Sequence, residues 1–267
     1  MLTAAARELV SAQTEYTPLQ GTDPLQFAQP TYIIKLLQAI AKANPQLAQI
    51  KLSKGSATSI AGLHLPADAS LAELIAHVRD PEVAWPALRL LWTELTTVPG
   101  RPPVLLSLDG LVHVMGPSAY RDPAFALVHA HDLSVVGLFA DALAGRAPMV
   151  NGGAVVGALT KGNCPRNPSV DLAIARAEAR VAGQPEPKTD PWEKGYDARS
   201  LEVLSAVETL RVAGITRDEA RAVMEYWAAS GVLRSQVTEA NVADRWTLGG
   251  NGVYGEIERI SLLNMRT

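Results

Sequence analysis

Cysteine is almost absent from this chain of 267 residues, since Cys164 is the single one. An intramolecular disulfide is therefore excluded, and with it the class of small secreted scaffolds that several disulfides hold together. Aromatic residues make up only 5% of the sequence and charged residues 19%, but hydrophobic residues reach 48%. A chain of this composition can bury a core, so we expect a folded protein rather than a disordered one.

Long hydrophobic runs are also absent. No segment approaches the roughly 18 uncharged apolar residues that a membrane-spanning helix needs, so we expect no membrane partner. Residues 1–15 lack the basic start and the continuous apolar stretch of a signal peptide. They are not rich in arginine and serine either, so we expect no transit peptide within this sequence.

The chain has no excess of one charge. It carries 24 Lys plus Arg against 27 Asp plus Glu, a formal net charge of −3. Residues 1–165 hold 11 basic and 12 acidic side chains, residues 166–267 hold 13 and 15, and no run of Lys or Arg occurs. A protein that binds nucleic acid through phosphate neutralisation needs a basic face, so we expect contacts with nucleic acid to be limited and local.

Hydrophobic periodicity and capping signals predict several helices before residue 100. An apolar stripe predicts a helix over 32–43. Ser70 with Glu73 forms a capping box, and Asp80 directly before Pro81 is typical of a helix start. Behind that start the apolar residues of one helix face are best explained as packing residues; they are Trp85, Leu88, Trp92 and Leu95.

Two short apolar runs predict strands of a parallel sheet. The run VLLSL over 104–108 stops at Asp109, and a second run, Ala154–Leu159, ends in the polar residues 160–163. A helix expected over Asp132–Ala144, with Asp132 as its N-cap, separates them. Runs of this kind are typical of strands covered on both faces, so the order predicts a doubly wound α/β sheet.

Composition divides the chain into three parts. A segment rich in proline and charge, 183–197, is the best candidate linker. Residues 1–182 then form the α/β core, and residues 198–267 form a mainly helical C-terminal domain. Within that domain we expect a last strand near 208–212 and a helix that the capping box of Thr216 opens.

The ends of the two predicted strands carry the candidate site residues. Asp109 at one strand end can hold Mg²⁺ beside a phosphate, or it is simply a polar cap. Thr160 and Asn163 follow the other strand. The chain contains no GxxxxGK(S/T) motif, so the loop and lysine that cradle phosphates are missing from it.

Two other groups carry weaker signals for chemistry. His129, His131 and Asp132, with His113 not far away, could bind a metal ion, but the spacing of a zinc site is absent. Cys164 as a nucleophile lacks a partner base that the sequence identifies. The histidine cluster is better explained by structure, with Asp132 capping its helix.

Several long runs, separated but in a fixed order, identify the chain with a known family. It closely resembles the mitochondrial small-ribosomal-subunit proteins of the death-associated-protein-3 family, in their fungal form, over nearly its whole length. The runs that carry the resemblance are ELVSAQTEY, QFAQPTYIIKLLQAIAKAN, RPPVLLSLDGLVHVMGPSAYRDPAF, VHAHDLSVVGLFADALAG, NGGAVVGAL, ARAVMEYWAASGVLR and ADRWTLGGNGVYGEIER.

This resemblance implies a P-loop NTPase core of the AAA type with a C-terminal helical, lid-like part, and an association with guanine nucleotide. Asp109 then matches the Walker B aspartate and would hold Mg²⁺ through water, while Thr160 and Asn163 match the polar sensor. In the family the phosphate-binding loop and its strand precede the segment that resembles residues 2–16, so we expect this chain to lack both. GTP, GDP or ATP with Mg²⁺ is the implied cofactor, and none is expected where the loop is truly absent.

The family also sets the expected function. The residue after the aspartate is Gly110, where hydrolysing relatives of the AAA type place a glutamate, so we expect no enzyme activity. The resemblance implies a structural component of the mitochondrial small ribosomal subunit in the matrix, acting in translation, whose partners are other small-subunit proteins with limited rRNA contact. The alternative is a P-loop switch or hydrolase that binds ATP or GTP. A role as an adaptor in cell death follows from the family's name alone.

Overall fold

The computed structural model describes residues 2–56, 60–159 and 165–262. The chain divides into two compact units, Met1–Thr209 and Leu210–Thr267. The boundary therefore lies beyond the segment 183–197 that we expected to be the linker. The reason is that helix α7 (Ala198–Val203) packs against α5 (Ser134–Leu143) and α6 (Pro168–Val181), which ties residues 183–203 to the first unit.

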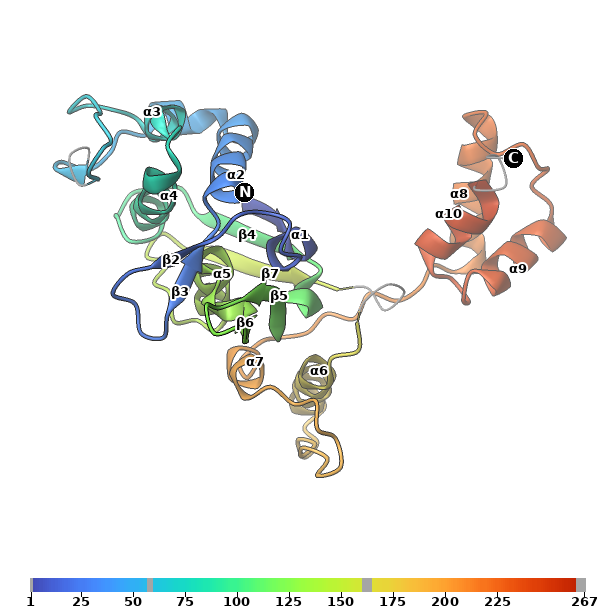
Figure 1. Ribbon diagram of the computed structural model, residues 1–267. Coiled ribbons are helices and arrows are strands. Elements are labelled where there is room, and N and C mark those ends of the chain that lie inside the picture. Colours follow the sequence, from blue (N-terminus) through green and yellow to red (C-terminus); the bar gives the residue numbers. More distant parts are fainter. Residues whose placement is uncertain (1, 57–59, 160–164, 263–267) are drawn as a thin grey trace. The chain divides into compact units, whose positions relative to one another are not determined.

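The first unit is built on a parallel sheet of three strands (Figure 1). Strand β4 (Val104–Asp109) lies in the middle and pairs with β1 (Leu2–Ala5) on one side and β7 (Gly153–Ala158) on the other. The mixed α/β class and both expected strands are confirmed. Strand β1 was not predicted, because the sequence Leu-Thr-Ala-Ala lacks the run of β-branched residues that marks a strand.

The two faces of this sheet differ. On β4 the side chains of Val104, Leu106 and Leu108 are buried. Those on the opposite face are open, since Leu105 is 39% exposed and Val156, which pairs with Ser107, is 48% exposed. The expectation that both faces are covered is therefore wrong for the described residues. An uninterrupted apolar run looks the same in sequence whether one face or both are buried.

Helices cover the buried face and the surrounding core. The capping box of Ser70 and Glu73 and the N-cap Asp80 are both present, as predicted. No helix among the described residues combines the length and the apolarity that crossing a membrane requires. The remaining α-helices in the described part of the first unit are α1 (Ala6–Val10), α2 (Pro30–Ala43), α3 (Leu71–His77) and α4 (Pro81–Thr96).

Two β-hairpins complete the first unit, and neither was predicted. One joins β2 (Thr17–Leu19) to β3 (Gln26–Ala28). The other joins β5 (Pro117–Arg121) to β6 (Leu127–His129). The ring of Tyr16 makes edge contacts with Phe27 at 5.7 Å and Tyr120 at 4.7 Å between ring centroids, which links the two hairpins.

The second unit is a small helical domain with α8 (Arg217–Ala229), α9 (Glu239–Leu248) and α10 (Tyr254–Leu262). The capping box of Thr216 with Glu219 opens α8 as predicted. The strand expected near 208–212 is not formed among the described residues, since no described strand pairs with this segment. Its apolar side chains also lack a core to pack against, because Leu210 is 89% and Val212 86% exposed. The core of the unit consists of Ala220, Met224, Trp227, Leu233, Val242 and Ile257.

Candidate functional site

Asp109 lies at the carboxyl end of β4 with an exposed side chain. The next residue, Gly110, has a positive φ of 76°, a backbone conformation that favours glycine. Its N–H donates to the carbonyl of Ala158 at 3.0 Å, which brings the ends of β4 and β7 together as expected for neighbouring parallel strands. Thr160 and Asn163, expected at the end of the second strand, lie outside the described residues, as does Cys164.

The described residues at this edge do not by themselves make a complete site for a magnesium nucleotide. Asp109 supplies one carboxylate, and nowhere in the described ranges do three or more His, Cys, Asp or Glu side chains gather as metal ligands. The sequence has no phosphate-binding motif, and glycine stands where a glutamate would activate water. We therefore derive no catalytic step from bound nucleotide.

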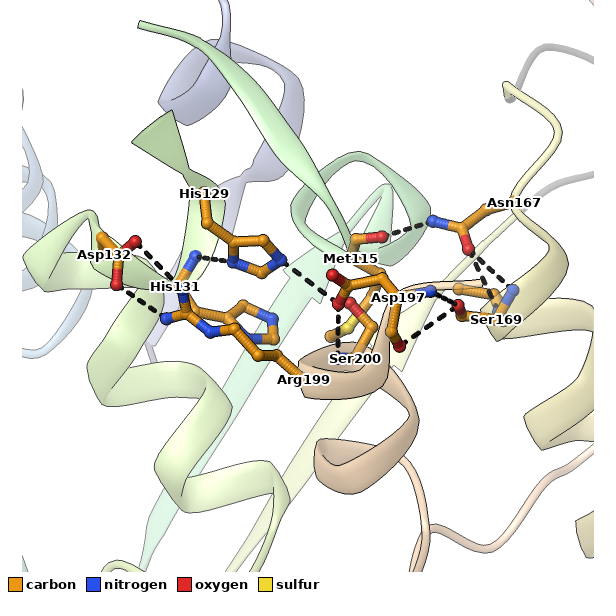
Figure 2. A network of polar contacts seen from close by, with 10 residues as sticks. Met115, His129, His131, Asp132, Asn167, Ser169, Asp197, Arg199 and Ser200 are labelled. Carbon is orange, nitrogen blue, oxygen red and sulfur yellow. Dashed lines mark hydrogen bonds and ion pairs between the residues drawn. The ribbon is translucent and has the colours of Figure 1, made fainter. Parts of the chain in front are cut away.

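A polar network begins just beyond this edge (Figure 2). The side-chain amide of Asn167 donates to the carbonyl of Met115 at 2.5 Å, and its oxygen accepts the N–H groups of Ser169 and Val170 at 3.1 and 3.2 Å. Asn167 is thus the N-cap of α6 and also fixes the turn that follows β4. The start of α6 is held in this way to the segment that follows the middle strand of the sheet.

Asp197 joins three elements in the same network. Its carboxylate caps α7 by accepting the N–H of Ser200 at 2.7 Å, and it accepts from His129 Nε2 at 3.2 Å. Its own N–H donates to Ser169 Oγ at 2.7 Å, at the start of α6. Burial raises the pKa of Asp197, but the hydrogen bonds from Ser200 and the contact with His129 outweigh burial and hold that pKa below its ordinary value.

His129 and His131 form the buried centre of this network. His129 Nδ1 accepts the N–H of His131 at 3.1 Å, which assigns the ring proton to Nε2, facing Asp197. The two rings meet edge to face at 4.5 Å. His131 is 8% exposed, and its Nε2 has no hydrogen-bond partner among the described residues. We call Asn167, Ser169, Asp197, His129 and His131 the His129–Asp197 network.

Both imidazoles are held neutral by their surroundings. Burial, the neighbouring His129 and the positive charge of Arg199 lower the pKa of His131 to about 4. Burial and Arg199 also lower the pKa of His129, although Asp197 opposes them. Because His129 uses both nitrogens in hydrogen bonds within the protein, it has none left for a metal ion. The structural interpretation of the cluster is therefore the one that the geometry supports.

Asp132 is not the N-cap that we expected. It ends a 3-10 turn, Ala130–Asp132, and Leu133 occupies the N-cap position of α5. The carboxylate instead forms a two-bond ion pair with Arg199 on α7, at 3.0 and 2.6 Å. The sequence therefore indicates a structural role for Asp132 but not its partner. Arg199 lies 67 positions further along the chain and leaves no local signal beside Asp132.

A second buried polar group, the Glu94 cluster of Ser53, Ser56, Glu94 and Arg101, lies elsewhere in the first unit. Glu94 is 1% exposed and accepts from the N–H of Ser53 at 3.0 Å, from the hydroxyls of Ser53 and Ser56 at 3.0 and 2.8 Å, and from Arg101 at 2.5 Å. Burial raises its pKa, but these hydrogen bonds outweigh burial and lower it overall. Sequence reasoning missed the cluster, although a glutamate at helical spacing from the apolar residues Ala87 and Leu91 was a signal.

Comparison with known proteins then decides the family. The family model for the mitochondrial ribosomal death-associated protein 3 matches residues 2–260. The chain belongs to this family. The resemblance drawn from the separated sequence runs is therefore confirmed, and the match includes most of both compact units of this family member.

A curated relative gives the same result. The small ribosomal subunit protein mS29 of Neurospora crassa is 48% identical over 264 residues, which is 98% of this chain. The match covers 56% of that relative, so the chain spans about half the length of the curated protein it matches.

Proposed function

We propose that this member of the death-associated protein 3 family is a structural component of the small subunit of the mitochondrial ribosome, and that it acts in translation in the mitochondrial matrix. The observation that carries the proposal is the family match over residues 2–260, together with 48% identity to a protein named as a small ribosomal subunit protein. Other small-subunit proteins are its main partners. A net charge of −3 favours protein contacts over an interface dominated by rRNA.

We further propose that the first unit is a core of the P-loop NTPase type and that the second unit, Leu210–Thr267, contributes a lid-like helical part. Three parallel strands with an aspartate at the end of the middle strand support this proposal. The unpaired edge of β7 within the described residues and the open face around Val156 also support it, because parallel sheets are normally covered on both faces. A further strand at that edge would fit such a core.

Nucleotide is at most a weakly held structural ligand in this proposal. Asp109 would hold Mg²⁺ through water if GTP, GDP or ATP were bound, with Thr160 and Asn163 beside the phosphates. The chain has neither the phosphate-binding motif nor a glutamate at position 110, so we propose that it does not hydrolyse nucleotide.

Sedimentation tests the structural proposal. A tagged form of the chain is produced in the cells that encode it, and their mitochondrial lysate is separated on a sucrose gradient. We expect the chain in the fractions of the small ribosomal subunit, and we expect it to leave them when EDTA dissolves the particle. A chain found only in the free fractions would refute the proposal.

A second candidate function, a switch or hydrolase acting on ATP or GTP, is favoured by one observation, the exposed Asp109 beside the end of β7. Steady-state phosphate release distinguishes the two functions. We expect the wild-type chain and the Asp109→Asn variant to release phosphate at the same background rate. A rate that the substitution abolishes would establish the enzyme instead.

A further inference from the structure

The tip of the β5–β6 hairpin presents an aromatic side chain to solvent. Phe125 is 76% exposed and Leu127 51%, and Leu127 pairs with Arg121 across the hairpin. Phe125 also has a positive φ of 69°. We call Arg121, Asp122, Phe125 and Leu127 the hairpin tip.

A positive φ is unusual for a bulky residue. Within the described ranges three residues other than glycine have one, namely Ala12, Phe125 and Asn251, whereas eleven glycines do. A glycine would adopt this conformation without the clash that a side chain makes, so the backbone does not explain a phenylalanine here. Backbone strain of this kind is found mainly at functional positions, so it indicates a function for the exposed Phe125 ring.

Four hydrogen bonds among residues 121–126 hold the tip in this conformation. The N–H of Phe125 donates to the carbonyl of Asp122, and the N–H of Asp122 donates to the carbonyl of Ala126, both at 2.9 Å. The carboxylate of Asp122 accepts the N–H of Ala126 at 2.8 Å, and Arg121 donates to the carbonyl of Phe125 at 2.7 Å. The guanidinium of Arg121 also lies 5.5 Å from the centre of the Phe125 ring.

The base of the hairpin is anchored in the core. Tyr120 is 1% exposed, and its hydroxyl accepts from the side-chain amide of Gln29 at 2.9 Å. Ser118, which is 5% exposed, donates to the carbonyl of Val128 at 2.7 Å. A stiff base and a fixed tip mean that little side-chain and loop entropy is lost when the ring is buried in an interface, and such preorganisation favours binding.

We infer that the hairpin tip is a docking element that inserts Phe125 and Leu127 into an apolar pocket of a neighbouring protein. Aromatic residues and arginine are enriched at the centres of protein interfaces, where a few anchors carry most of the affinity. The inference rests on the proposed function in one respect, which is that the neighbour is a protein of the small ribosomal subunit.

The balanced charge of the hairpin favours a protein over RNA as the partner that contacts Phe125. Within 117–129, the hairpin with its tip, Arg121 is the one Lys or Arg and Asp122 the one acidic residue. Arg121 already donates to the backbone of the tip and lies against the Phe125 ring. An aromatic platform for RNA bases needs basic side chains beside it to neutralise phosphates, and this tip offers no surplus of positive charge.

The Phe125→Gly variant separates docking from folding. Because glycine favours a positive φ, we expect the melting temperature of the full chain to stay unchanged or to rise. Retention of the variant on small-subunit particles washed in high salt should fall about tenfold or more, as for the loss of an interface anchor. Val181→Ser, at a position that is 83% exposed outside the hairpin, is the matched control and should keep normal retention.

A photo-crosslinking residue at position 125 identifies the occupant. The chain carrying p-benzoylphenylalanine there is assembled into small subunits in cells and irradiated, and the adduct is treated with ribonuclease or protease. We expect an adduct that resists ribonuclease and contains a small-subunit protein.

Each other outcome counts against one of the two proposals. An adduct with rRNA, the absence of any adduct, or full retention of Phe125→Gly on the particles overturns the docking inference while the proposed function stands. A wild-type chain that does not sediment with small subunits overturns the proposed function, and the docking inference falls with it.

Discussion

The Glu94 cluster and the His129–Asp197 network are both buried, and both join segments that lie far apart in the sequence. The first is built around a carboxylate that stays charged, because it accepts four hydrogen bonds, one of them from Arg101. The second is built around two imidazoles that stay neutral, because burial and the nearby Arg199 disfavour their protonation. The pKa values of Glu94 and of both histidines are therefore all lowered, but for opposite reasons: the surroundings stabilise the charged form of Glu94 and destabilise the charged form of the imidazoles.

This difference has a consequence for stability. A lowered pKa on an acid means that folding favours its charged form, whereas a lowered pKa on a histidine means that folding excludes the charged form. The Glu94 cluster is therefore sensitive to the loss of a partner, since any unpaired charge would remain buried. The His129–Asp197 network is sensitive to acid, since no described residue offers His131 Nε2 an acceptor for an added proton.

Removing the carboxylate should have the largest effect. We expect Glu94→Ala to lower the free energy of unfolding by about 3–5 kcal/mol, because Arg101, whose side chain is 15% exposed, would lose its counter-charge and Ser53 its acceptor. Urea unfolding of the full chain at pH 7 measures the loss. Glu82→Ala, at an exposed position of the same helix, is the control and should cost less than about 1 kcal/mol. Equal losses in the two variants would contradict the distinction.

The second-largest effect should be a loss of stability in acid, caused by protonation of His131. With a folded pKa of about 4 for His131 against about 6.5 unfolded, the unfolded state binds more protons between these values. Stability should therefore fall as the pH drops from about 6.5 to about 4, by about 3 kcal/mol for His131. The carboxylates Glu94 and Asp197 also have lowered pKa values, but their unfolded values are 4.5 and 3.8, so they add to the loss only at lower pH.

Substitution of His131 tests whether this residue causes the fall. The variant His131→Leu keeps a buried side chain of similar size but removes the titrating group, so stability should change less between pH 6.5 and 4.5 than in the wild type. His64→Gln, at an exposed histidine, is the control and should leave the fall in place. If His131→Leu keeps the full pH dependence, the loss arises elsewhere in the chain.

The two buried clusters also show which features could be predicted from the sequence and which could not. Local signals were sufficient for helix starts such as Ser70 and Thr216 and for the strands that end at Asp109 and Ala158, because caps and apolar runs involve neighbouring residues. Both polar clusters depend on partners that are distant in sequence, such as Asp197 for His129. A sequence pattern carries no information about such pairs.

The strand-end site was predicted only in part for a different reason. The position of Asp109 next to the end of β7 follows from two parallel strands, and the structure confirms it. Thr160 and Asn163 stay a prediction, because they lie outside the described residues. The open sheet face at Leu105 and Val156 could not be foreseen, because the pattern of a strand does not show which of its faces another element covers.

The smallest effect should come from the ion pair at the edge of the histidine region, and it should depend on pH. Arg199 is 43% exposed although its partner Asp132 is only 15% exposed, so Arg199→Ala should cost about 1 kcal/mol at pH 7, since water reaches one side of the pair. Arg199 also lowers the pKa of both histidines, so its removal lets them accept protons more readily and reduces the acid loss. The cost of Arg199→Ala should therefore shrink between pH 7 and pH 5.

Arg146 provides the matched control for this last measurement. It is 45% exposed and pairs with Asp141 and Glu202, so its loss should cost a similar small amount at pH 7. Arg146 is not among the main charges that shift the pKa of either histidine. The cost of Arg146→Ala should therefore be the same at pH 7 and pH 5. If both variants show the same pH dependence, Arg199 does not help to keep the imidazoles neutral, and burial together with the contact between the two rings accounts for the acid sensitivity of the network.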